Sequence, residues 1–202
     1  MADGLGFWVG GVTEFGGQGK RAKPLNKLGR FNLTSKDWQI EETPFGARVN
    51  GSTVFLAVGE KGVLLNFGGQ EYPKVGGPGA ELISFDTIQI YDIAGHSWHG
   101  QRTSGDHTAR DKAVGVNANG IPHGRLNPCS VAVQTGGASD LSYHVYMLGG
   151  YWEDVDFHEV WVLSIPSFRW TLVKHSKNID SSTTSQLDYS LTAMSLIPNS
   201  VI

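Results

Sequence analysis

Residues 63–69 read VLLNFGG and residues 88–98 read IQIYDIAGHSW, and variants of both strings occur on either side of them. The first string is a short apolar run that ends at two residues without Cβ atoms, which predicts a strand that stops at an unusual backbone turn. The second string leads from a strand-like run through a polar turn to a tryptophan. Together the two strings predict short antiparallel strands joined by tight turns.

Both strings occur three times, so the chain carries an internal repeat. The glycine pairs are Gly10-Gly11 in GFWVGG, Gly68-Gly69 in VLLNFGG and Gly149-Gly150 in HVYMLGG. The turn strings are LGRFNLTSKDW, IQIYDIAGHSW and VWVLSIPSFRW, which end at Trp38, Trp98 and Trp170 and place Phe31, Tyr91 and Leu163 at one shared position. A further strand is expected before two of the glycine pairs, at Thr53–Ala57 and at Cys129–Val133, each after a Pro…Arg segment.

The composition agrees with an all-β protein that has many turns. Gly accounts for 27 of 202 residues, and 40% of the residues are hydrophobic, which argues against disorder. We find no capped run with a 3.6-residue period, so no helix is predicted. The formal net charge of -3, with no basic stripe, argues against nucleic-acid binding. No uninterrupted apolar run approaches 18 residues, so no membrane span is predicted.

These strings resemble the repeats of the kelch family, over about residues 5–173. The resemblance implies four-stranded antiparallel blades packed around an axis, with the tryptophans buried between blades. Gly29-Arg30 inside the first turn string, and Leu163 where an aromatic residue is usual, depart from the motif. We therefore expect an all-β partial kelch β-propeller of about three blades.

The expected units are a first repeat at 1–46, a second at 47–120, a third at 121–174 and a Ser/Thr-rich tail at 175–202, whose order we leave open. Propellers close with about four to eight blades. Three blades do not close a ring, so we interpret the chain as a fragment of a longer propeller.

The resemblance implies a protein-binding scaffold that is not an enzyme and needs no cofactor. Loops at the ends of the blades are the expected contact surface, and four arginines in or beside them are candidate contact residues: Arg48, Arg102, Arg110 and Arg125. The alternative for each is a solvated or ion-paired side chain. Open blade faces also allow self-association.

A metal-dependent catalytic propeller, of the oxidase or small-molecule lyase type, is the alternative function. Its candidate ligands are His96 and His99 with the nearby Asp106, His107 and Asp111, and the acidic run Glu153–Glu159. His96 falls in a turn that the other repeats fill with unrelated residues, so we predict no metal site. The segment Gly115–Gly120 is expected to be a flexible loop rather than a phosphate-binding one.

Cys129 is the single cysteine, so the chain cannot form an internal disulfide. Together with the absence of a signal-like N-terminus, this makes the cytoplasm the default compartment. A secreted protein without disulfides is also compatible with the sequence.

Overall fold

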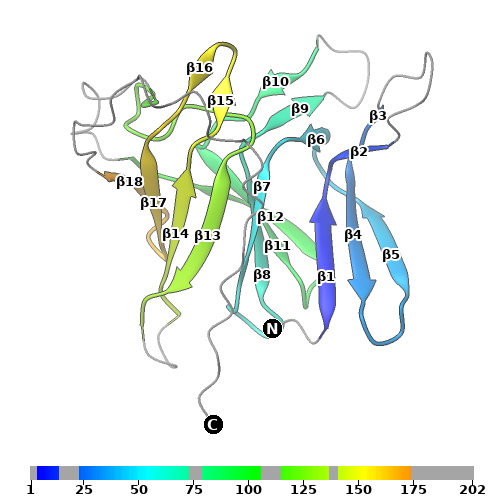
Figure 1. Ribbon diagram of the computed structural model, residues 1–202. Helices are drawn as coiled ribbons and strands as arrows, with labels where there is room; N and C mark the ends of the chain where they lie inside the picture. The colour runs from blue at the N-terminus through cyan, green and yellow to red at the C-terminus, as the bar shows by residue number, and fades with distance from the viewer. Residues whose placement is uncertain (1–3, 14–22, 73–78, 106–114, 137–140, 174–202) are drawn as a thin grey trace.

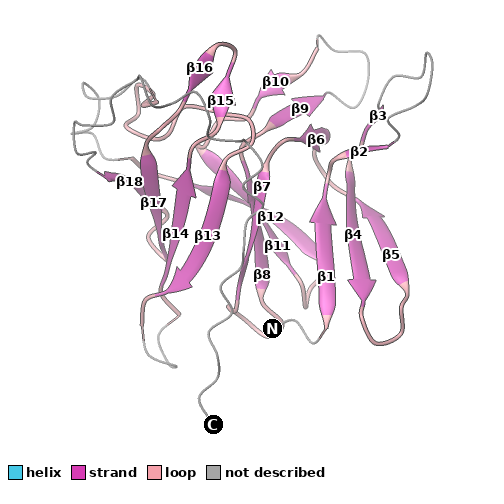
Figure 2. Ribbon diagram, viewed as in Figure 1, coloured by secondary structure: helices cyan, strands magenta, loops and turns pink. Residues whose placement is uncertain are grey.

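The computed structural model describes residues 4–13, 23–72, 79–105, 115–136 and 141–173. The described residues form strands and turns and no helix (Figure 2), so none of them belongs to a helix that could cross a membrane. The repeat units become three antiparallel sheets that stand side by side (Figure 1). The all-β prediction and the partial propeller are confirmed.

Each main sheet contains one glycine-pair strand and one turn hairpin. Sheet 1 has the order β1 (Leu5–Val9), β4 (Lys27–Asn32) and β5 (Trp38–Glu42). Sheet 2 has the order β7 (Ser52–Leu56), β8 (Val63–Phe67), β11 (Thr87–Asp92) and β12 (Ser97–Arg102). Sheet 3 has the order β13 (Cys129–Gln134), β14 (Tyr143–Leu148), β17 (Val160–Ile165) and β18 (Arg169–Val173). The extra strands predicted near residues 53 and 129 are β7 and β13, and sheet 1 has three strands among the described residues.

Smaller strands extend beyond the main sheets, at the upper end in Figure 1. They are the pair β2 (Val12–Thr13) and β3 (Lys23–Pro24), the group β6 (Ala47–Val49), β9 (Gln70–Tyr72) and β10 (Glu81–Leu82), and the pair β15 (Tyr151–Trp152) and β16 (Val155–Asp156).

The turns before the three tryptophans share one backbone conformation. Lys36, His96 and Phe168 each stand two residues before the tryptophan, and their φ angles are 64°, 50° and 50°. Non-glycine residues seldom adopt this left-handed region. In the first two repeats a side chain also caps the turn: Asn32 Oδ1 accepts from the amide of Thr34 at 2.8 Å, and Asp92 Oδ1 accepts from that of Ala94 at 3.0 Å. The three repeats therefore share a backbone conformation at this turn as well as a residue pattern.

Two apolar clusters join the sheets. The larger cluster packs aliphatic residues of sheet 2, such as Leu65 and Ile88, against Val145, Trp161 and Trp170 of sheet 3. The smaller cluster joins sheet 1 to sheet 2 through the buried residues Leu28, Leu64, Tyr91 and Ile93. A single sheet exposes two faces. Each of the two inner interfaces therefore removes one face of each of its two sheets from water.

The three turn tryptophans all point the same way along the row of sheets. Trp170 is 0% exposed and makes edge contacts with Phe67 and Phe85 of the sheet 2 repeat, at 6.1 and 5.5 Å between ring centroids. Trp98 packs toward sheet 1, with its ring 5.0 Å from that of Phe45. Trp38 is 57% exposed, because it lies on the face of sheet 1 that points away from sheet 2. The expectation of burial between blades therefore holds for Trp170 and not for Trp38.

The glycine at position 29, which departs from the family motif, is explained by a contact within sheet 1. A Cβ atom at this position would lie 2.0 Å from the indole ring of Trp8, which stands opposite it on β1. The ring covers the space that a side chain at Gly29 would need. The absence of a side chain at Gly29 thus makes room for the Trp8 ring within sheet 1.

Candidate functional site

Three hairpins project from the same end of the row of sheets, and we call this surface the hairpin end. Each begins directly after a glycine pair: β2 after Gly11, β9 after Gly69 and β15 after Gly150. The carbonyl oxygens of these three glycines accept hydrogen bonds from the amides of Leu25, Ile83 and Phe157, each at 2.9 Å. The repeated bond closes the base of each hairpin, so the repeat itself positions the three projections together (Figure 1).

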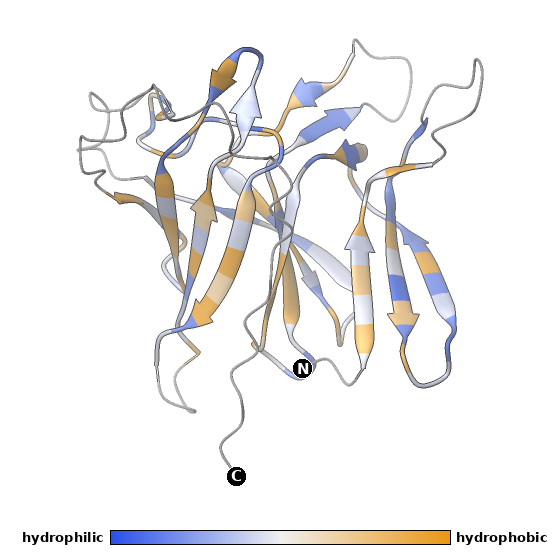
Figure 3. Cartoon of the chain, viewed as in Figure 1, coloured by the Kyte–Doolittle hydropathy of each residue, from blue (hydrophilic) through white to orange (hydrophobic). Residues whose placement is uncertain are grey.

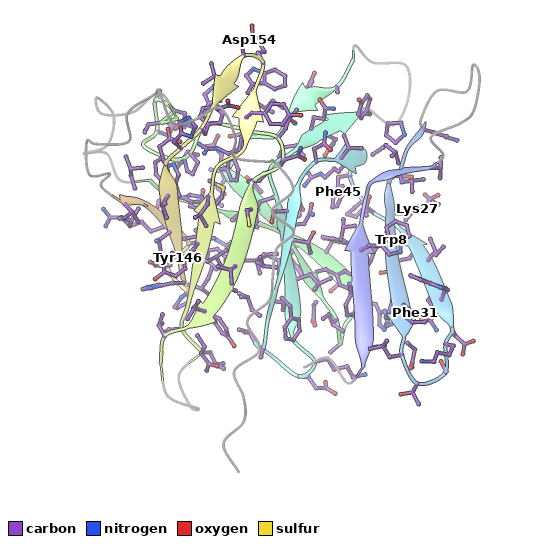
Figure 4. The ribbon with its side chains drawn as sticks, viewed as in Figure 1. Trp8, Lys27, Phe31, Phe45, Tyr146 and Asp154 are labelled. Atoms are coloured by element: carbon purple, nitrogen blue, oxygen red, sulfur yellow. The ribbon has the colours of Figure 1, made fainter. Side chains whose placement is uncertain are left out.

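Acidic and aromatic side chains occupy the described parts of the hairpin end. Glu153 and Asp154 form the exposed tip between β15 and β16, and Asp154 lies at the top of Figure 4. Glu81 on β10 is exposed as well, whereas Tyr72 and Trp152 are half-buried. Aromatic side chains are enriched in protein-binding surfaces.

Arg48 is buried beneath the second hairpin rather than displayed on it. Its Nε donates to Glu71 Oε2 at 2.8 Å, and its Nη1 donates to Asn66 Oδ1 at 3.2 Å. The guanidinium carbon lies 4.0 Å from the centroid of the Phe45 ring. Burial lowers the pKa of Arg48, while the pairing with Glu71 acts in the opposite direction. This is the ion-paired alternative, so we do not retain Arg48 as a contact residue.

Arg125 occupies the corresponding place before sheet 3 and is 0% exposed. Its guanidinium donates to Glu159 Oε2 at 3.4 Å and to the carbonyls of Gly149 and Gly115 at 3.1 and 3.2 Å. Burial lowers the pKa of Arg125 to about 10, which leaves the group charged at neutral pH. We do not retain Arg125 as a contact residue either.

The segment that was expected to be a flexible loop takes part in this arrangement. A Cβ atom at Gly115 would lie 2.0 Å from Glu159 Oε1, and Val116 forms a β-bridge with Pro122. Gly115 is thus packed against the pair of Arg125 and Glu159. The flexibility of the rest of the segment stays a prediction.

The other two candidate arginines differ from these. Arg102 is exposed at the end of β12, and Arg110 lies outside the described residues. Of the three candidate arginines that the structure describes, only Arg102 is exposed, so no two of these three meet at the surface. The structural role of Arg48 and Arg125 was not predicted from the sequence. Both follow a proline in a Pro…Arg segment that occurs in two repeats, and this shared position could have indicated a shared structural role.

A cleft of about 240 Å³ lies between sheet 1 and sheet 2. Its lining residues are Leu28, Arg30, Gln39, Ile40, Glu41 and Tyr91.

Beside this cleft, Arg30 Nη1 lies 3.3 Å from His96 Nε2, and His96 Nδ1 lies 3.2 Å from the Tyr91 hydroxyl. Arginine only donates, so Nε2 accepts and Nδ1 carries the proton that it donates to Tyr91. Burial and Glu41 raise the pKa of Tyr91 above its ordinary value of 10.0.

His96 therefore links two sheets, while the exposed His99 pairs with Ser97 at 3.0 Å. Within the described ranges, no three His, Cys, Asp or Glu side chains gather as they would around a metal ion. Asp106, His107 and Asp111 lie outside those ranges. Cys129 is a free, half-buried thiol.

The chain is similar in sequence to a known protein. The chain is 31% identical over 149 residues, or 71% of its length, to a Kelch repeat-containing protein of Arthroderma benhamiae. The chain spans 19% of the length of that relative. No family model matches the chain.

Proposed function

Because this chain is a kelch-repeat protein, we propose that it binds a protein partner through the hairpin end. The observation that supports the proposal is the repeated closure of the three hairpins by Gly11, Gly69 and Gly150. A surface built from projections on a rigid framework suits recognition, because sequence changes in the projections leave the sheets unaltered.

The described charges favour a basic partner. Glu81, Glu153 and Asp154 are exposed at the hairpin end, against Lys23 on β3. Charge of one sign on a surface speeds association with a partner of the other sign. Arg102 remains a proposed contact at the margin, where it is exposed at the end of β12.

The proposal is tested by reversing charge at the hairpin tip. Proteins captured by the wild-type chain are compared with those captured by Glu153→Lys/Asp154→Lys. Glu60→Lys is the matched control, because Glu60 is exposed in the turn between β7 and β8, at the opposite end of the strands. We expect partners that are lost with the tip variant and kept with the control. Partners that both variants keep would place the binding surface elsewhere.

A further inference from the structure

No described strand covers the two outer faces of the three-sheet row, and these two faces, which we call open in that sense, are chemically different. We define the leading face of a sheet as the one that carries its turn tryptophan, and the trailing face as the opposite one. The leading face of sheet 1 carries Trp8, Phe31, Trp38 and Ile40, and Trp38 and Ile40 are 57% and 61% exposed. The trailing face of sheet 3 carries Val131, Val133, Tyr146, Leu148 and Val162, with Val133 and Leu148 46% and 41% exposed.

These assignments follow from the alternation of side chains along a strand. On β14, Val145 and Met147 are buried against sheet 2, so Tyr146 and Leu148 point to the other side. Figure 4 shows Tyr146 on one side of the molecule and Trp8 and Phe31 on the other. In Figure 3 the strands of sheet 3 are largely hydrophobic, as expected for a sheet that is covered on both faces.

The inner interface between sheets 2 and 3 shows which faces match. The trailing face of sheet 2 is mainly aliphatic, with Val54, Leu65 and Ile88. It meets an aromatic leading face on sheet 3, with Trp161 and Trp170 fully buried in the contact. The open leading face of sheet 1 is likewise aromatic, and the open trailing face of sheet 3 is likewise mainly aliphatic. The two outer faces therefore have the chemistry of the two halves of an interface that the chain already makes.

We propose that two copies of this chain associate head to tail, with the trailing face of sheet 3 in each copy packed on the leading face of sheet 1 in the other. Two such contacts cover all four open faces. They produce a ring of six sheets, which lies within the range of about four to eight over which propellers close. Three copies give nine sheets and fall outside that range. A pair is therefore the closed assembly that these faces favour.

Light scattering after size exclusion of the 202-residue chain tests this proposal directly. We expect twice the chain mass of 21.9 kDa, with no growth to larger species as concentration rises. A monomer at every concentration overturns the proposal and points to further sheets of a longer polypeptide as the cover. A series of masses that grows with concentration overturns the closed ring.

Single substitutions test the pairing of the faces. Ile40→Lys on the leading face and Val133→Lys on the trailing face each place a charge in the proposed contact. We expect each to raise the dimer dissociation constant about tenfold or more. Val155→Lys is the control, because Val155 is 40% exposed on the β15–β16 hairpin and belongs to neither face. Dissociation caused equally by the control overturns the assignment of faces.

Mixing the two variants distinguishes head-to-tail contact from contact between like faces. Ile40→Lys keeps an intact trailing face, and Val133→Lys keeps an intact leading face, so the mixture retains one complete contact. We expect a heterodimer at a concentration at which each variant alone is mostly monomeric. If either variant alone stays as dimeric as the wild type, the contact joins like faces and the proposal fails. Because the hairpin tip is unchanged in both variants, this outcome does not depend on partner binding.

Discussion

The amide of Gly69 donates a hydrogen bond of 2.8 Å to the carbonyl oxygen of Arg125. This bond joins the glycine pair of sheet 2 to the segment that leads into sheet 3. Gly11 makes the same bond, of 2.7 Å, to the carbonyl of Arg48 before sheet 2. Both arginine side chains turn inward to a carboxylate, at Glu159 and at Glu71. Each boundary between sheets thus repeats one arrangement, in which the glycine pair of one repeat holds the buried arginine of the next.

Gly69 should therefore be intolerant of any side chain. Gly69 has a φ of 79°, and a Cβ there would lie 2.3 Å from the carbonyl oxygen of Val49. Gly59 has a nearly equal φ of 77° with nothing within 4 Å of such a Cβ. Gly59→Ala should cost about 1–3 kcal/mol from backbone strain alone. Gly69→Ala should cost clearly more in urea denaturation, and equal losses would show that the close approach is not real.

The buried pair of Arg125 and Glu159 should contribute far more than a surface pair. Arg125→Ala leaves the Glu159 carboxylate buried without its partner, which we expect to cost about 3–5 kcal/mol of unfolding free energy. Lys27→Met breaks the exposed pair with Glu42 and should cost less than about 1 kcal/mol. Chemical denaturation measures both. Similar losses for the two variants would contradict the burial of Arg125.

Alkaline conditions should destabilise the contact between sheets 1 and 2 through Tyr91. The raised pKa of Tyr91 keeps it protonated in the fold, whereas an unfolded tyrosine ionises near 10.0. Its contribution to stability is therefore complete below that pH and is lost as the pH rises through the folded pKa. Tyr91→Phe should reduce the fall in unfolding free energy between about pH 9 and pH 11. A Tyr91→Phe variant that keeps the wild-type slope would contradict this role of Tyr91.

The left-handed turn residue offers a stabilising substitution. Lys36 has a φ of 64° and an exposed side chain. Lys36→Gly therefore relieves backbone strain in the fold, although it also raises the conformational entropy of the unfolded chain. We expect a net gain of up to about 1 kcal/mol. Ser35→Gly, one residue earlier and without a positive φ, should be neutral or destabilising. A loss of stability on Lys36→Gly would show that this turn conformation is not adopted.

The sequence predicted the repeated elements because their cause is local. Glycine pairs, polar turns and tryptophans at a fixed spacing are enough to predict β8, β11 and β12 and their counterparts. The roles of Arg48 and Arg125 were not predictable in this way, because their partners Glu71 and Glu159 lie 23 and 34 residues away. The exposure of Trp38 was missed for a related reason: its burial depends on a neighbouring sheet and not on its own strand.

The sheets stack in chain order, with Trp98 and Trp170 each facing the preceding sheet and Trp38 on the outer face of sheet 1. Urea denaturation of Trp170→Ala, Trp98→Ala and Trp38→Ala tests this order most directly, at a protein concentration low enough that the midpoint no longer depends on it. We expect a loss of about 3–5 kcal/mol for Trp170, a smaller loss for Trp98 and less than about 1 kcal/mol for Trp38. A loss at Trp38 as large as that at Trp170 would contradict this order of stacking.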